Sequence, residues 1–191
     1  SQASSTILTI YTKDKPRLFQ RISACCLDLG ISIVDARIFS NKDNSILDIL
    51  WIQDTFGEKI TDERRLIRFK ERILEFITEK NMPDIRINYK LDKRAIAFNV
   101  TPYVEIDNSL SERFSVIEVS GKDRPGLLYD LTKSLSDMNI NIHSAHIATF
   151  GERATDVFYV LSQNGEKVFS RKKINSIEKE LIKSIIIADN V

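Results

Sequence analysis

Hydrophobic residues along the chain follow two patterns, and both patterns occur twice. Runs with apolar residues at every second position predict strands, whereas apolar residues three or four positions apart predict amphipathic helices. The predicted order in the first half is strand, helix, strand, strand, helix, and the second half repeats it. This order is typical of an α+β unit with an antiparallel sheet and helices on one face.

A short turn motif shows that the halves are copies of one unit. Lys13-Asp14-Lys15-Pro16-Arg17-Leu18 returns 109 positions later as Lys122-Asp123-Arg124-Pro125-Gly126-Leu127. Self-similarity at a fixed spacing indicates repeated structural units. We therefore predict two ferredoxin-like βαββαβ units, the first at 6–90 and the second at 114–191, with a linker at 91–113. A proline near a helix start is tolerated, and we expect the preceding aspartate to cap the helix.

The second copy ends too soon after its last helix to contain a final strand. The linker offers a replacement, Ile96–Ile106, which we expect to pair antiparallel with Phe114–Ser120 as an edge strand. Pro102 within that segment is compatible only with an edge position, because proline cannot donate a hydrogen bond to a neighbouring strand. The first copy has its own candidate for a final strand, Ile85–Tyr89.

The second strand of each unit contains an irregularity. The apolar alternation slips by one position between Ile33 and Ala36, and again between Ile142 and Ala145. A slip of one residue indicates a β-bulge, and bulges concentrate at edges and near functional sites. A bent edge strand is the alternative interpretation. We predict a bulge in each interval.

The third strands, Ile46–Gln53 and Ala154–Ser162, are apolar on both faces, so we expect both faces to be covered. Asp48 and Asp156 recur near the starts of these strands. We interpret them as structural caps rather than as an acid–base pair.

Composition narrows the function classes. The chain has 28 basic and 27 acidic residues, and this balance does not favour binding to nucleic acid or to an anionic membrane. No apolar run reaches the roughly 20 residues that a membrane-spanning helix needs. The adjacent Cys25 and Cys26 cannot cross-link a fold, which fits a reducing cytoplasm, and the helical spacing places Cys26 in the core. Ser1–Ser5 is interpreted as the cut end of a longer protein.

Catalytic and metal-binding patterns do not emerge from the sequence. His143 and His146 are expected on opposite faces of a strand, which makes a poor metal pair. A phosphate-binding glycine loop and a nucleophilic triad are both missing. We therefore expect this chain alone to have no catalytic residues, metal or cofactor.

The second turn motif could nevertheless bind a small molecule. It places backbone N–H groups at a helix start beside the carboxylate of Asp123 and beside Gly126, which leaves room for close approach. These groups suit the carboxylate and ammonium of a free amino acid. The same residues are equally consistent with an ordinary strand-to-helix turn.

The turn motif followed by Asn141-Ile142 resembles the ACT domain, a regulatory module that binds amino acids. The similarity extends to the tandem C-terminal ACT domains of the bifunctional PII uridylyltransferase and uridylyl-removing enzymes. The segments that carry this wider resemblance are Val34–Ile38, Trp51–Asp54, Ile106–Ser109, Val116–Val119 and Ser144–Ala154. It covers the chain from about Ser5 to Ile187.

The resemblance implies a regulatory region that senses glutamine and is joined to nucleotidyltransferase and hydrolase domains. Those catalytic domains would use Mg²⁺ and UTP and would act on the PII protein in nitrogen regulation. The resemblance is also consistent with a homodimer formed through ACT units. It carries ligand-binding roles onto a set of second-copy positions, namely Asp123, Arg124, Pro125, Gly126, Leu127, Leu128, Asn141, Ile142 and His143.

The first copy departs from the family pattern. Arg17 stands where glycine is expected and Ser32 where asparagine is expected, and in the second copy Asn139 replaces a common glycine. Arg17 would close the first pocket or, alternatively, pair with a ligand carboxylate. The corresponding weaker candidates are Asp14, Arg17, Leu18, Ser32, Ile33 and Val34. The opposing wall of the second-unit site would come from Asn141–His143 or from Ser32–Val34.

Other functions remain as alternatives. A free-standing regulatory protein built of ACT repeats would carry the same motifs without a catalytic parent. An RNA-recognition domain shares the fold, but Phe158 and Tyr159 alternate faces and the basic-Gly-aromatic signature is missing. A ferredoxin-like phosphatase would need an arginine and an asparagine at a phosphate loop, for which Arg17 is the sole hint.

Overall fold

The computed structural model describes residues 4–40, 43, 45–85, 100–150 and 152–186, and the chain divides into two compact units, 1–90 and 91–191. Each unit combines an antiparallel sheet with two helices. The predicted α+β class, with antiparallel sheets and helices, is confirmed.

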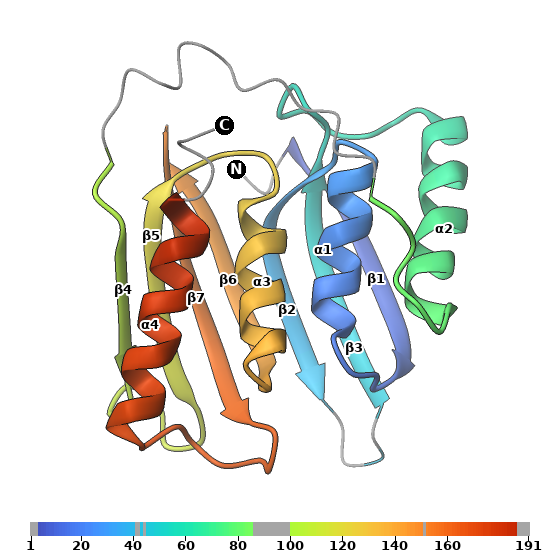
Figure 1. Cartoon of the computed structure of the whole chain (residues 1–191). Helices are drawn as coiled ribbons and strands as arrows, with labels where there is room; N and C mark the ends of the chain where they lie inside the picture. Colours follow the sequence, from blue (N-terminus) through green and yellow to red (C-terminus); the bar gives the residue numbers. More distant parts are fainter. Residues whose placement is uncertain (1–3, 41–42, 44, 86–99, 151, 187–191) are drawn as a thin grey trace. The chain divides into compact units, whose positions relative to one another are not determined.

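Unit 1 contains the elements β1 (Thr6–Lys13), α1 (Leu18–Asp28), β2 (Ser32–Ser40), β3 (Ser45–Gln53) and α2 (Glu63–Thr78). Strand β3 lies between β1 and β2 and runs antiparallel to both. The two helices lie on the same face of this sheet (Figure 1). Asp62 caps α2 by accepting a hydrogen bond from the backbone N–H of Arg65.

Unit 2 contains β4 (Tyr103–Asp107), β5 (Ser115–Lys122), α3 (Leu127–Asp137), β6 (Ile140–Phe150), β7 (Arg153–Ser162) and α4 (Arg171–Ile186). Its strands are ordered β6, β7, β5, β4, and each neighbouring pair is antiparallel. Helices α3 and α4 cover one face of the sheet (Figure 1).

The linker supplies the edge strand of unit 2. Strand β4 pairs antiparallel with β5, with Tyr103 opposite Ser120. The expected pairing is therefore confirmed over Tyr103–Ile106. Pro102, however, directly precedes the strand instead of lying within it, because its missing N–H is tolerated where pairing begins. Residues 96–99 and 86–89 lie outside the described residues, and Ile85 is not part of a strand.

Both predicted bulges are present. The register of β2 against β3 shifts between Ile33 and Asp35, and that of β6 against β7 shifts between Ile142 and Ser144. The extra residue in each strand restores the apolar residues that follow, such as Ala36 and Ala145, to the buried face.

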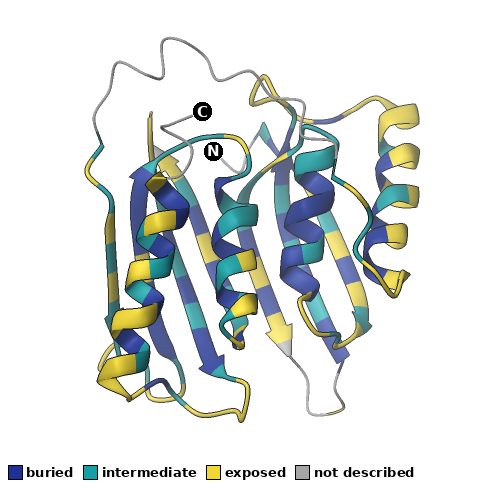
Figure 2. Ribbon diagram, viewed as in Figure 1, coloured by how far each residue is buried: buried dark blue, intermediate teal, exposed yellow. Residues whose placement is uncertain are grey.

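The core of each unit lies between the sheet and its helices (Figure 2). In unit 1 the helix-facing residues, such as Leu50, are fully buried, whereas Trp51 on the other face is only half-buried and its neighbour Ile7 is 61% exposed. The expectation that helices or strands cover both faces of β3 is therefore wrong for the described part of unit 1. Both helices lie on one side of the sheet. On the other side, the guanidinium of Arg37 stacks on the ring of Trp51.

The two cysteines belong to the core of unit 1. Cys25 and Cys26 are both buried in α1, as the helical spacing predicts for Cys26. Burial raises the pKa of the Cys25 thiol to about 12 and raises that of Cys26 as well. Both thiols are therefore protonated near neutral pH and poorly nucleophilic.

Candidate functional site

The strongest candidate site is the turn that joins β5 to α3 in unit 2. Gly126 directly precedes α3 and has φ of 82°, a left-handed conformation that glycine adopts without strain. Two backbone hydrogen bonds shape the turn, from Leu127 N to Arg124 O (3.2 Å) and from Asp130 N to Gly126 O (2.9 Å). A third, from Asp123 N to Glu152 O (2.9 Å), fixes the end of β5.

No side chain caps α3, although we expected Asp123 to do so. The left-handed residue at 126 separates this carboxylate from the first helical turn, and the same is true of Asp14 and α1. Asp123 is instead half-buried, and burial raises the pKa of its carboxyl group. Hydrogen bonds from the Arg124 N–H and the Thr149 hydroxyl oppose that shift. An uncapped helix start beside a half-buried carboxylate can attract both charged ends of an amino acid.

The equivalent turn of unit 1 has the same backbone but a different surface. Arg17 adopts the left-handed conformation with φ of 64°, which is strained for a residue with a side chain. Leu18 N donates to Lys15 O at 3.2 Å, as in the second turn. Asp14 and Arg17 are both exposed, so this turn is the more open of the two.

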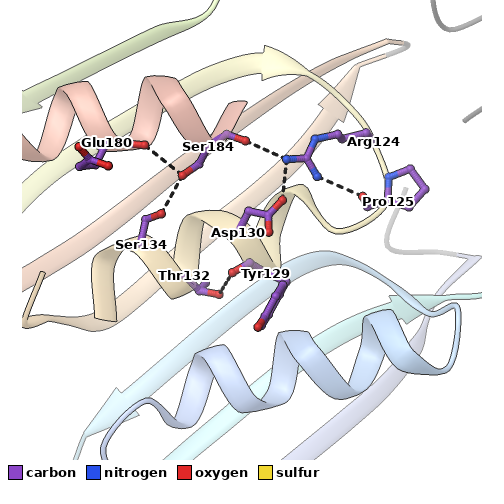
Figure 3. A network of polar contacts seen from close by, with 8 residues as sticks. All are labelled: Arg124, Pro125, Tyr129, Asp130, Thr132, Ser134, Glu180 and Ser184. Atoms are coloured by element: carbon purple, nitrogen blue, oxygen red, sulfur yellow. Dashed lines mark hydrogen bonds and ion pairs between the residues drawn. The ribbon is translucent and has the colours of Figure 1, made fainter. Parts of the chain in front are cut away.

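Arg124 belongs to a polar network that ties the turn to α4 (Figure 3). Its Nη2 donates to Asp130 Oδ2 (2.6 Å) and to Ser184 O (2.8 Å), and its side chain is 6% exposed. Ser184 Oγ donates to Glu180 O (3.0 Å) and lies 2.7 Å from Ser134 Oγ. Arg124 therefore binds partners within unit 2 through its Nη2 atom, and its expected contact with a ligand stays a prediction.

A second carboxyl group lies close to the turn. Asp156 of β7 is opposite Val119 of β5 and opposite Ile147 of β6, and it is 2% exposed. Burial, opposed by a hydrogen bond from the backbone N–H of Ala148 and reinforced by the negative charge of Asp123, raises the pKa of Asp156 to about 7. Its Oδ1 has no hydrogen-bond partner within the described part of the chain.

Unit 1 repeats this arrangement at Asp48, which is 1% exposed and has an unpartnered Oδ1. Burial and the charge of Asp14 raise its pKa to about 7. The interpretation of Asp48 and Asp156 as caps is therefore wrong, because both lie inside the core and not at a strand end. A signal was present in the sequence, since each aspartate occupies an inward position between apolar residues of its strand.

The start of β6 does not join the turn within unit 2. Along β7, Lys122 pairs with Arg153 whereas Asn141 pairs with Leu161, so the two segments lie at opposite ends of the sheet. Ile142 and His143 share the location of Asn141. Unit 1 has the same arrangement. Lys13 pairs with Ser45 at one end of β3, whereas Ser32 pairs with Gln53 at the other end. Ile33 and Val34 follow Ser32 and therefore also lie away from the turn.

The histidines lie in an aromatic cluster. His143 is 5.2 Å from Phe114 and His146 is 6.0 Å from Tyr159, and the rings of Phe114 and Tyr159 are 6.4 Å apart. Both histidines thus contact the same cluster, so the expectation of opposite faces is wrong. The bulge falls at His143 itself, between Ile142 and Ser144, so the two-residue alternation cannot be counted from His143 to His146. The described residues contain no group of three side chains suited to a metal.

Comparisons with known proteins identify the second unit. Residues 103–188 match the family model described as "ACR9-like, ACT-like domain". This match includes the turn, Asp156 and α4. Within the described residues, no helix is long and apolar enough to cross a membrane.

Curated relatives match nearly the whole chain. A protein of Bradyrhizobium diazoefficiens is 40% identical over 92% of this chain, one of Novosphingobium aromaticivorans is 38% identical over 94%, and one of Rhodopseudomonas palustris is 41% identical over 93%. Each is named "Bifunctional uridylyltransferase/uridylyl-removing enzyme". The chain spans about a fifth of the length of these relatives, 19%, 20% and 20% respectively.

The solved structure of an unknown protein from Galdieria sulphuraria aligns with 95% of this chain and 91% of its own. Its sequence identity is 12% and its TM-score is 0.33, a similarity too weak to bear on fold or function. The chain is thus homologous, over almost all of its length, to one region of the bifunctional enzymes, and its second unit matches an ACT-like family model.

Proposed function

We propose that this chain is the amino-acid-sensing region of a bifunctional uridylyltransferase/uridylyl-removing enzyme and that its ligand is glutamine. Relatives of that name are about 40% identical to it over at least 92% of its length, and its second unit matches an ACT-like domain. ACT domains as a class are regulatory modules. The chain would regulate its parent enzyme and take no part in the chemistry itself.

One observation carries the proposed site. In unit 2 a half-buried carboxylate, Asp123, lies beside the left-handed Gly126 and the uncapped start of α3. The carboxylate suits the ammonium of an amino acid, and the helix start suits its carboxylate. Pro125, Leu127 and Leu128 complete the turn, although Leu127 is buried and serves the core of the unit.

Unit 1 is proposed not to bind the ligand. Its glycine is replaced by Arg17, whose side chain is exposed at the turn, and its Asp14 is exposed as well. An exposed carboxylate binds a cation weakly because water screens the attraction. Pairing of Arg17 with a ligand carboxylate is the alternative, and it would give a second, weaker site.

The remaining roles are assigned to the rest of the parent protein. Its catalytic domains would use UTP and Mg²⁺ to modify the PII protein in the cytoplasm, and ACT units of two copies could associate as a homodimer. A free-standing protein built of ACT repeats is the competing proposal. The complete reading frame distinguishes the two, because the first proposal requires nucleotidyltransferase and hydrolase domains in the same polypeptide.

Calorimetric titration of this chain with each of the twenty amino acids tests the proposal. We expect glutamine to bind with a dissociation constant between about 1 μM and 1 mM, or roughly 8 to 4 kcal/mol, because a sensor must release its ligand at cellular concentrations. Stronger binding of another amino acid would correct the ligand. Failure of all twenty to bind would contradict the sensing role.

A further inference from the structure

Unit 2 holds a buried carboxyl group, that of Asp156, which the fold satisfies only in part through a hydrogen bond from the backbone N–H of Ala148. Asp156 is 2% exposed, and its Oδ1 makes no hydrogen bond to any residue that the structure describes. Buried polar atoms are nearly always satisfied, and an unpaired buried charge is costly. An apolar residue at this position would pack in the core without that cost, so the carboxyl group calls for a functional explanation.

The position of Asp156 connects it to the proposed binding turn. It lies on the helix-covered face of β7 together with Ala154 and Phe158, and it pairs with Val119, three residues before β5 ends at Lys122. Asp123 follows directly, and its negative charge acts on Asp156. The half-buried carboxyl group of Asp123 in the turn is therefore electrostatically coupled to the buried carboxyl group of Asp156 in β7.

We propose that Asp123 and Asp156 together receive the ammonium group of the amino-acid ligand, and that Asp156 releases its proton to solvent when that group arrives. This inference rests on the proposed function and adds a regulatory property to the same site, since ligand binding becomes coupled to pH.

The surrounding charges fit this behaviour. Burial and Asp123 raise the pKa of Asp156 to about 7, so without ligand the group carries a proton much of the time near neutral pH. Glu152 adds negative charge beside Asp123, and the positive charge of Arg124 is paired with Asp130. An arriving ammonium favours the ionised carboxylate and so lowers its pKa.

On α3, which covers the same face of the sheet, Lys133 is paired with Asp137. On α4, Glu180 is paired with Lys183 and both are substantially exposed. On β6, His143 and His146 contact the aromatic cluster of Phe114 and Tyr159. The positive partner of the carboxyl pair is therefore inferred to come from the ligand.

Unit 1 provides a matched control inside the same chain. Asp48 is buried like Asp156 and also has an unpartnered Oδ1, but its neighbour Asp14 is exposed at a turn where Arg17 replaces glycine. If the carboxyl group alone were sufficient, both aspartates would respond to ligand. The inference requires a response from Asp156 and not from Asp48.

The test follows the two carboxyl groups directly. Carbon-13 NMR of the chain labelled at aspartate side chains gives a titration midpoint for each, with Asp156→Asn and Asp48→Asn used to assign the signals. We expect saturating glutamine to lower the Asp156 midpoint by about one unit or more and to leave Asp48 unchanged. Glutaramate, which is glutamine without its α-ammonium, should not shift either group.

Calorimetry in phosphate and in Tris at pH 7 supplies a second readout, because the buffer dependence of the binding heat counts released protons. Wild type and Asp48→Asn should release a substantial fraction of one proton per glutamine, and Asp156→Asn should release almost none. Glutamine binding with an unmoved Asp156 midpoint would overturn this inference while leaving the proposed function intact.

A simple ammonium probe separates the remaining outcomes. If glutamine fails to bind but ethylammonium chloride lowers the titration midpoint of Asp156, the two carboxyl groups form a cation-binding site and glutamine is the wrong ligand. If neither compound shifts Asp156, the pair does not receive an ammonium group and the inference is overturned.

Discussion

The guanidinium of Arg124 donates a 2.8 Å hydrogen bond to the carbonyl oxygen of Ser184 in the last turn of α4. This contact joins the candidate binding turn to the end of the following helix, where a cation also meets the negative end of the helix dipole. Unit 1 achieves the same connection with Lys15, which donates to Ile77 O of α2 at 3.0 Å. Arg21 adds a 2.8 Å bond to the neighbouring Phe76 O.

Replacing Arg124 with alanine should loosen α4. The change removes three hydrogen bonds of a side chain that is 6% exposed, and it leaves Asp130 and the carbonyl groups of Ser184 and Pro125 without this partner. We expect a loss of about 2 kcal/mol, or roughly thirty-fold faster hydrogen exchange in α4. Replacement of the exposed Lys172 on the same helix is the control and should change stability by less than about 0.5 kcal/mol. Equal exchange rates in the two variants would contradict the role of Arg124.

Replacing Arg17 with glycine should stabilise unit 1. The residue has φ of 64°, where a side chain is strained and glycine is not. We expect the free energy of unfolding to increase by about 0.5–1 kcal/mol. This is less than the full strain energy, because glycine has more conformational freedom in the unfolded chain. Trp51 is the sole tryptophan and lies in unit 1, so its fluorescence during urea unfolding reports this unit. A loss of stability would show that contacts of the Arg17 side chain outweigh the strain.

The stability of unit 1 should decrease as the pH rises from about 4 to 7. Asp48 has a pKa of about 7 in the folded state, against 3.8 for the ordinary group, so the folded state binds more protons than the unfolded state within this interval. The resulting destabilisation grows with pH, is complete above about pH 7, and is on the order of 4 kcal/mol.

Asp48→Asn isolates this contribution. The asparagine side chain of the variant does not ionise, so any free-energy cost of burying it is independent of pH. The cost of ionising the buried Asp48 in wild type increases with pH. The stability of the variant relative to wild type, followed by Trp51 fluorescence, should therefore rise between pH 4 and 7 and then level off. A difference that stays constant with pH would mean that Asp48 ionises normally in the folded protein.

The sequence could predict the elements and the bulges because they depend on local periodicity. The slip between Ile142 and Ala145 predicted the register shift that the structure places between Ile142 and Ser144. The edge strand β4 was also predictable, since the missing last strand and Pro102 both indicated an edge partner for β5. Its exact start was not, because the first residue that pairs depends on tertiary geometry.

The site was predicted less completely than the fold. The spacing of residues does not reveal that Asn141 lies at the opposite end of the sheet from Asp123, because this depends on the antiparallel register of β7 with both neighbours. The role of Arg124 was missed because its partner Ser184 is 60 residues away in the sequence. Asp156 could have been recognised as a polar residue in an inward position, but its burial and its coupling to Asp123 required the structure.

Calorimetric binding of glutamine to a matched pair of glycine variants tests the central claim most directly. Gly126→Val would fill the turn but would also strain the backbone, whereas asparagine tolerates the left-handed conformation better. Gly126→Asn adds a side chain at the proposed site, and Gly165→Asn adds the same side chain at φ of 81° where nothing lies within 4 Å. We predict that Gly126→Asn loses glutamine binding by at least about ten-fold, or 1.4 kcal/mol, while Gly165→Asn binds like wild type. Unchanged binding to Gly126→Asn would contradict the assignment of the ligand site to this turn.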